Sequence, residues 1–168
     1  MKLPLVDEND TIVGYKQKDE LLSTDIYRVS RLVVLNSKGQ ILMAQRALTK
    51  QKDPGAWGLA VEGTVEKGES YESNIRKEAQ EEIGITLDNI EYGPKFRRKG
   101  KFNHFSQVFI CRIEIDADKL HLQASEVERV AWYDVAALQR ESIANPNKFG
   151  YRFKDILDVI LPSIRNEK

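Results

Sequence analysis

Apolar and polar positions along the chain alternate with a period of two in some segments and of about four in others, which predicts a mixture of strands and helices. Residues 29–35 and 40–46 are strand-like, and the turn residues 36–39 between them favour a hairpin. A second, N-terminal hairpin is expected over residues 3–15, with its turn at 7–10. Further strands are predicted at 57–62, 87–96, 103–115 and 127–133. The alternation within 103–115 predicts a half-buried strand.

Helical patterns occupy the middle and the end of the chain. Ser70 and Gly84 mark the start and the stop of a helix over residues 71–83. Asp134 is expected to cap a helix that runs through Glu141, and residues 18–23 to form a helical turn. A final amphipathic helix is predicted over 149–164, with these residues inward: Phe153, Ile156, Leu157, Ile160 and Leu161. The pattern indicates an α/β (α+β) fold in which a mixed sheet packs between helices.

Composition places the chain among ordinary globular proteins. A length of 168 residues suits one domain, 1–168, in which residues 1–26 form a hairpin extension. The formal net charge of zero gives no general attraction to nucleic acid, which we do not expect as a partner. The single cysteine, Cys111, excludes an internal disulfide and is expected in the core. We find no signal peptide and no apolar run long enough to span a membrane, so a cytoplasmic location is expected.

Three acidic side chains share one arc of the 71–83 helix. At about 100° per residue, Glu78, Glu81 and Glu82 lie together beside the apolar stripe, and Glu69 stands just before the helix. Like charges at this spacing cost roughly 0.2–0.5 kcal/mol per pair, and a divalent cation would turn the repulsion into attraction. Oxygen ligands favour Mg²⁺ or Mn²⁺ over zinc. A solvated acidic helix face is the alternative that the helix alone leaves open.

Residues 63–85 resemble the Nudix box. That pattern is Gly, five residues, Glu, seven residues, Arg-Glu, an aliphatic, any residue, Glu-Glu, any residue, Gly and an aliphatic. Every fixed position matches, from Gly63 and Glu69 to Gly84, except that Lys77 stands in place of Arg. The resemblance implies a Nudix-type α/β/α sandwich and a metal-dependent pyrophosphatase with these metal ligands: Glu78, Glu81 and Glu82. Because an ammonium lacks the two parallel donors of a guanidinium, we expect Lys77 to brace the helix more loosely and activity to be lower.

Hydrolysis of a diphosphate also needs a general base and phosphate contacts. Glu126 is our candidate base, together with Glu81, because 126–132 resembles the acid-rich strand that precedes a tryptophan in these enzymes. A surface role for Glu126 is the alternative. The candidate phosphate contacts are Arg28, Arg31, Arg46, Lys50 and Lys52, of which Arg46 is preferred, with a solvated surface charge as the alternative for each. The basic hairpin tip over residues 97–101 is a further candidate for binding a phosphate-rich ligand, with a solvated hairpin as its alternative. Trp57 is a candidate for stacking on the substrate, with a core role as its alternative. His104 and His121 lack ligand-spaced partners and are not assigned to a metal.

Two other functions remain in view. Residues 5–10, Tyr27-Arg28 and 54–57 resemble isopentenyl-diphosphate isomerases. Those enzymes need a catalytic cysteine and metal-binding histidines, but Val61, Thr64 and Tyr27 occupy those positions here. A non-catalytic Nudix domain that binds a nucleotide or partner is the other alternative. The predicted partner is a small-molecule diphosphate; a homodimer is compatible with the sequence, which leaves the substrate and the oligomeric state open.

Overall fold

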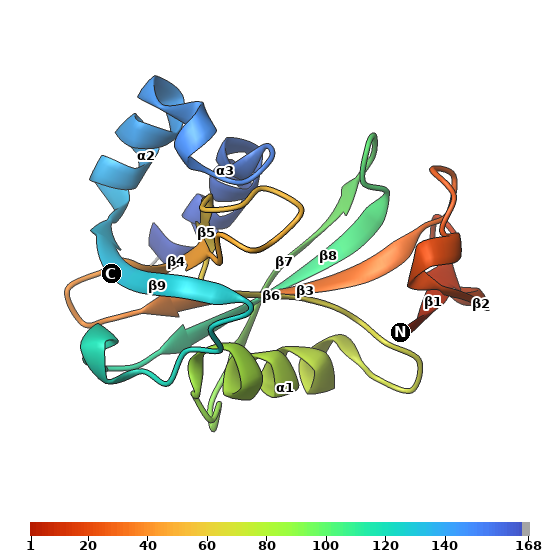
Figure 1. Cartoon of the computed structure of the whole chain (residues 1–168), viewed down its shortest axis with the longest axis horizontal. Coiled ribbons are helices and arrows are strands. Elements are labelled where there is room, and N and C mark those ends of the chain that lie inside the picture. Colours follow the sequence, from red (N-terminus) through yellow and green to blue (C-terminus); the bar gives the residue numbers. More distant parts are fainter. Residues whose placement is uncertain (166–168) are drawn as a thin grey trace.

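The computed structural model describes residues 1–165, and its elements follow the predicted segments closely (Figure 1). The strands are β1 (Lys2–Val6), β2 (Ile12–Gln17), β3 (Tyr27–Leu35), β4 (Gln40–Arg46), β5 (Trp57–Leu59), β6 (Val61–Thr64), β7 (Glu91–Arg98), β8 (His104–Arg112) and β9 (Val127–Asp134). The helices are α1 (Tyr71–Ile83), α2 (Val135–Ala144) and α3 (Phe153–Arg165). Within these described residues, no helix has the length and apolar character needed to cross a membrane.

Seven strands form one mixed sheet, in the order β5-β4-β3-β8-β7, with β6 also paired to β3 and β9 to β4. The β3 and β8 strands run parallel, from Tyr27 opposite His104 to Leu35 opposite Arg112. β8 therefore has a neighbour on each side and is buried on both faces, not half-buried as its alternation predicts. Alternation reports the polarity of the side chains, whereas burial here is set by helices that cover both faces of the sheet.

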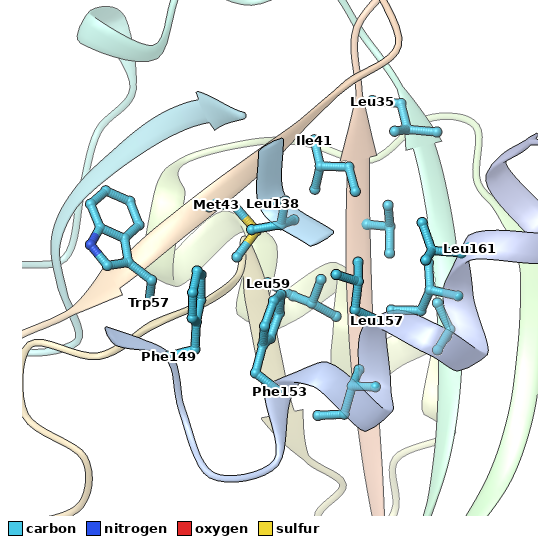
Figure 2. Close-up of a cluster of buried hydrophobic side chains, with 14 of the residues drawn as sticks. Leu35, Ile41, Met43, Trp57, Leu59, Leu138, Phe149, Phe153, Leu157 and Leu161 are labelled. Carbon is cyan, nitrogen blue, oxygen red and sulfur yellow. The ribbon is translucent and has the colours of Figure 1, made fainter. Parts of the chain in front are cut away.

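Successive strand residues face two different hydrophobic cores. Leu32, Val34 and Phe109 pack with Ile75 and Ala79 of α1. The other face packs against α2 and α3, through a cluster that includes Val33, Ile41, Met43, Leu138, Leu157 and Leu161 (Figure 2). Figure 1 shows α1 on one side of the sheet and α2 with α3 on the other. The predicted sandwich with a mixed sheet is confirmed.

The C-terminal helices differ from the prediction mainly at their ends. All five predicted inward residues of α3 are buried, but the helix begins at Phe153 because Arg152 before it takes a left-handed φ of 55°. Helix α2 continues to Ala144. Asp134 stands at the N-cap position of α2 without a side-chain capping bond, since its Oδ1 accepts a hydrogen bond from Gln40 Nε2 at 3.2 Å.

The single strand predicted over residues 57–62 is wrong: it is two strands that serve different neighbours. β5 pairs with β4, whereas β6 pairs with β3, and the chain changes direction at Ala60. A local apolar run cannot reveal which strand each half will pair with. The split matters for function, because it places Glu62 and Gly63 in β6 beside α1.

The N-terminal hairpin of β1 and β2 forms its own two-stranded sheet. Asp10, from the hairpin turn, accepts a hydrogen bond from Arg28 Nε at 2.7 Å and from Tyr71 Oη at 3.0 Å. Tyr71 opens α1, so the hairpin is tied to the start of that helix.

Candidate active site

Helix α1 approaches β6 most closely at Gly63. A Cβ atom at this position would lie 2.5 Å from Asn74 Oδ1 and from Glu78 Cγ, so only glycine fits. The predicted ends are also confirmed: Ser70 Oγ accepts the backbone N–H three residues on at 3.0 Å, and Gly84 terminates the helix at a φ of 71°. Helix α1 is thus fixed at its ends and along one side, which sets the direction of its carboxylates.

A cleft of about 840 Å³ lies beside this helix, a volume typical of small-molecule sites. Its lining includes one set of acidic and one set of basic residues. We call the first the acidic group, which consists of Glu62, Glu78, Glu81, Glu82 and Glu126. The second, the basic group, consists of Arg31, Lys52, Arg98, Lys101 and His104. A smaller hollow of about 590 Å³ elsewhere carries a single carboxylate, Glu114, among its lining residues.

Glu82 is the most strongly perturbed member of the acidic group. Burial raises its pKa to about 8, and the carboxylates of Glu78, Glu126 and Glu62 add to the rise. Burial also raises the pKa of Glu78, whereas Glu81 is exposed at the rim of the cleft. Four of the five carboxylates are those that the sequence singled out, and three parts of the chain bring them together. Sequence analysis missed Glu62. Its position directly before Gly63 was the only feature of the sequence that pointed to a place in the site.

Glu126 lies just before β9 and faces a lysine. Lys50 Nζ donates to Glu126 Oε2 at 2.6 Å, and the Glu126 carbonyl accepts from the Ala47 N–H at 2.9 Å. The ion pair anchors the Glu126 carboxylate within the cleft. It therefore occupies a place from which it can act on a bound ligand.

The carboxylates are near one another but do not form a closed ligand cage. Within residues 1–165, no group of three or more His, Cys, Asp or Glu side chains is arranged to hold a metal ion. The donors are all oxygens, which suits Mg²⁺ or Mn²⁺, and Mg²⁺ is commonly held by one or two carboxylates plus substrate phosphates. The donor chemistry fits such an ion, while the arrangement leaves coordination positions to a ligand.

Glu69 does not join the acidic group, although its place before the helix suggested that it could. Its Oε2 accepts from Asn74 Nδ2 at 2.8 Å, and its Oε1 lies 2.7 Å from Lys77 Nζ. Lys77 also contacts Glu66 at 3.1 Å and Glu78 at 3.7 Å. Burial opposes a rise in the pKa of Lys77, but the carboxylates of Glu69 and Glu66 outweigh it and raise the pKa. One ammonium thus bridges the loop before α1 to the helix itself.

Asn74 is a buried polar side chain whose importance the sequence did not reveal. It accepts a short hydrogen bond from Ser30 Oγ and donates to Glu69 Oε2, and to the Thr64 carbonyl at 3.2 Å. Asn74 therefore connects β3, β6 and α1 directly behind the acidic group.

Sequence analysis names Arg31 and Lys52 among the candidate phosphate contacts and places Arg98 and Lys101 in the basic run 97–101, but it gives His104 no part in the site. Arg31 and His104 are 4% and 3% exposed and come from the parallel strands β3 and β8. Arg31 Nε donates to Ser106 Oγ at 3.1 Å, and its guanidinium forms an ion pair with Glu62. Burial lowers the pKa of His104 to about 3, and Arg31 and Arg98 lower it further. Sequence analysis could not show that these residues meet, because the strands that carry Arg31 and His104 lie far apart in the chain.

Arg46 and Trp57, the two predicted substrate contacts, both line the cleft. Arg46 Nε donates to the Lys52 carbonyl at 3.0 Å, which engages part of its guanidinium within the loop after β4. Trp57 is only 5% exposed and packs in the core, with its ring 5.4 Å from that of Tyr133. Little of the Trp57 ring is therefore free to stack on a ligand.

The positions that an isomerase would use carry no acid–base chemistry here. Val61 is buried and apolar, and Cys111, the only cysteine of the chain, lies in the core. The Tyr27 ring lies 5.3 Å from that of His104, at the basic group. Burial raises the pKa of Tyr27, so its hydroxyl stays protonated.

Comparisons with known proteins agree with this geometry. The NUDIX domain model matches residues 27–152. A Nudix hydrolase of Deinococcus radiodurans is 32% identical over 118 residues, 70% of this chain and 68% of the relative. A prenyl-diphosphate phosphatase of Methanosarcina mazei is 30% identical over 153 residues, 86% and 85% of the two chains. The crystal structure of DR0079 from Deinococcus radiodurans shares the fold, with a TM-score of 0.83 and 23% identity over 95% of this chain and 99% of that one. The family match covers most of the chain and includes the whole box, so the protein belongs to the Nudix family and is a hydrolase.

Proposed function

We propose that the protein hydrolyses the diphosphate bond of a small-molecule substrate of the type X–diphosphate–Y in the presence of Mg²⁺ or Mn²⁺. One observation carries the proposal: separate parts of the chain bring Glu62, Glu78 and Glu126 to the same cleft as Glu82. Their carboxylates oppose the ionisation of Glu82. Burying carboxylates together is unfavourable unless a cation compensates them. The single domain of residues 1–168, with 1–26 as its extension, is part of the same proposal.

Glu78 and Glu82 are the residues that we propose to hold the metal, with Glu81 at the rim as a third ligand. A bound divalent ion neutralises the charge of the phosphates, orients them and lowers the pKa of a bound water. Because the carboxylates do not enclose a site by themselves, we expect substrate phosphates to complete the coordination. Metal binding and substrate binding would then strengthen each other.

Glu126 is the proposed general base. It shares the cleft with Glu82, and the Lys50 ammonium at 2.6 Å fixes its position. A base must reach the attacking water within hydrogen-bond distance, and Glu126 is held beside the proposed metal ligands rather than on the helix that bears them. Glu81 is the alternative base, which its exposure leaves free to move. We propose Arg46, at the end of β4, as a phosphate contact; β4 pairs with β9, the strand that follows Glu126.

The substrate panel follows from the comparisons. The panel contains nucleotides, nucleotide sugars and dinucleotides. Prenyl diphosphates are added because of the similarity to a prenyl-diphosphate phosphatase. The experiment measures hydrolysis of this panel with Mg²⁺, with Mn²⁺ and with chelator, for the wild type and for Glu82→Gln. The phosphorylated products are separated by chromatography, because a diphosphate capped at both ends yields two monophosphates and no free phosphate. We expect turnover that needs the metal and falls at least about 100-fold in Glu82→Gln.

Glu72→Gln is the matched control for this variant. Glu72 also lies on α1, but it pairs with Arg76 outside the cleft, so turnover should be retained. Full activity in Glu82→Gln, or turnover without any metal, would overturn the proposal. An assay for isomer formation from isopentenyl diphosphate, run in parallel, should give no product.

A further inference from the structure

We propose that the basic group, Arg31, Lys52, Arg98, Lys101 and His104, is a subsite for a terminal phosphate of the substrate. The protein would then prefer substrates whose phosphate chain ends in a free, uncapped phosphate over those whose diphosphate is capped at both ends. This inference rests on the proposed diphosphate hydrolysis and specifies its substrate class.

Buried polar atoms without partners are the first observation. Both ring nitrogens of His104 are buried and lack a hydrogen-bond partner among the described residues. Arg31 Nη1 is also buried; it lies close to the Glu62 carboxylate, yet without the geometry of a hydrogen bond. Leaving such groups unsatisfied costs about 1–3 kcal/mol each, so a ligand that supplied acceptor oxygens here would be favoured.

The remaining cations of the basic group are held by aromatic rings rather than by carboxylates. Lys52 Nζ lies 3.4 Å from the centre of the Phe102 ring, and Lys101 Nζ lies 5.7 Å from that of Tyr151. Arg98 stacks on Tyr151 at 5.4 Å and donates to the Tyr151 carbonyl at 2.8 Å. Cation–π contacts leave the charge uncompensated. Within residues 1–165, none of these three cations forms an ion pair.

The local balance of charge is positive. Among residues 1–165, Glu62 is the one carboxylate in ion-pair contact with the basic group, through Arg31. Asp53 attracts Lys52 more strongly than Glu62 does, and Asp155 adds a weaker attraction on Arg98. Burial lowers the pKa of Arg98, and the neighbouring Arg31 lowers it further. Several cations that repel one another across a cleft form a site for a multiply charged oxyanion, and a guanidinium is well shaped to bind phosphate.

Glu62 also shows that the two groups are close together. Its carboxylate acts on Glu82 in the acidic group and on Arg31, Lys52 and Arg98 in the basic group. A phosphate chain whose scissile part lies at the acidic group would therefore extend its end toward the basic group. A free terminal phosphate brings more negative charge to that place than a capped one, which gives the preference for substrates with an uncapped terminal phosphate.

The test uses two exposed lysines of the basic group, because the buried Arg31 and His104 are part of the core. The double variant Lys52→Gln/Lys101→Gln removes two charges at exposed positions, together with their contacts to the Phe102 and Tyr151 rings. Lys99→Gln is the matched control: it lies on the same hairpin tip, its side chain is 69% exposed, and it pairs with Glu8 rather than lining the cleft.

Two measurements keep the subsite separate from the proposed hydrolysis. Calorimetric titration with inorganic tripolyphosphate, without metal, should show binding to the wild type and to Lys99→Gln, and at least about 10-fold weaker binding to the double variant. In the hydrolysis assay, the double variant should raise KM at least about 10-fold for a substrate with an uncapped terminal phosphate, such as a prenyl diphosphate or a nucleoside triphosphate. Its kcat should stay within about threefold, and the KM for a capped diester should change little.

Equal tripolyphosphate affinity in the wild type and the double variant would overturn the subsite, and so would an unchanged KM. If no diphosphate were hydrolysed at all, the proposed function would fall, but the titration would still decide whether the basic group binds phosphate. If hydrolysis required Glu82 and the double variant behaved like the wild type, the function would stand and the subsite would fall.

Discussion

The acidic group and the basic group line the same cleft but leave opposite charges uncompensated. In the acidic group, Glu82 is crowded by carboxylates and its ionisation is opposed. In the basic group, the buried Nη1 of Arg31 and both ring nitrogens of His104 lack hydrogen-bond partners among the described residues. One of these sets needs a cation and the other an anion. A metal-bound phosphate chain supplies both, so the contrast between the two groups describes the ligand more fully than either group does alone.

The two groups also respond to pH in opposite directions. The pKa of Glu82 is raised above its usual value near 4.5, so the metal-free fold loses stability as pH rises toward 8. The pKa of His104 is lowered below its usual value near 6.5, so the fold loses stability as pH falls toward 3. Each group can therefore be probed by its own pH window.

The largest effect is expected from Gly63→Ala, which disturbs the acidic group from beneath. The new Cβ would meet Asn74 and Glu78 at 2.5 Å, so α1 must shift away from β6. We expect a loss of about 1–3 kcal/mol in the free energy of unfolding, measured by urea denaturation, and a large fall in kcat. Gly58→Ala is the control, because a Cβ there meets nothing within 4 Å and stability should change by less than about 1 kcal/mol. Equal stability in the two variants would show that the close approach of α1 is not needed.

His104→Gln tests the basic group through acid stability. In the wild type, His104 of the unfolded chain is protonated below pH 6.5, whereas the buried ring of the folded protein is protonated only below about pH 3. Stability should therefore fall by up to about 1.4 kcal/mol per pH unit as pH is lowered from 6.5 to 4.5. This pH-dependent loss of stability should be missing from His104→Gln. It should be present in His121→Gln, which removes an exposed imidazole. Urea denaturation at several pH values measures it; identical slopes in all three proteins would contradict the buried neutral ring.

Glu82→Gln tests the acidic group in the opposite direction and without substrate. In chelator, removing this carboxylate should raise Tm at pH 8, because a buried ionised group is lost, and should have little effect at pH 4.5. A gain of about 1 kcal/mol corresponds to roughly 2–4 °C for a protein of this size. Added Mg²⁺ should narrow the difference by stabilising the wild type. The same Tm difference at both pH values would argue that Glu82 is not crowded.

The parts of the fold that sequence predicted well are those fixed by local chemistry. The ends of α1 follow from Ser70 and Gly84, which act on the backbone within one turn. The inward face of α3 follows from periodicity in the same way. The division of 57–62 into β5 and β6 could not be predicted, because it depends on two strands, β4 and β3, that lie elsewhere in the chain.

In the candidate site, too, the residues that sequence predicted well are those brought together by local structure. Glu78, Glu81 and Glu82 are close in sequence, and their common direction could be predicted from helix geometry. Arg31 and His104 are 73 positions apart and meet only because β3 and β8 pair in parallel. A local pattern gives no sign of that pairing, so the sequence offers Arg31, Lys52 and the run 97–101 only as separate phosphate contacts and cannot place them with His104 in one group.

The smallest effect is expected from Lys77→Arg, which restores the residue of the family pattern. Sequence reasoning predicts that lysine braces the helix loosely, yet its ammonium contacts Glu69 and Glu66 within 3.1 Å and reaches Glu78 at 3.7 Å. Because these pairs are partly exposed, each contributes at most about 1 kcal/mol, and a guanidinium would exchange three contacts for a two-pronged bond to one carboxylate. We expect unfolding free energy to change by less than about 0.5 kcal/mol and kcat/KM by less than about threefold, whereas Lys77→Met should lose more of both by leaving Glu66 and Glu69 facing each other. A gain above about 10-fold in kcat/KM for Lys77→Arg would mean that lysine positions the acidic group poorly. The crowding of its carboxylates would then reflect the missing guanidinium of an arginine and not the need for a metal ion.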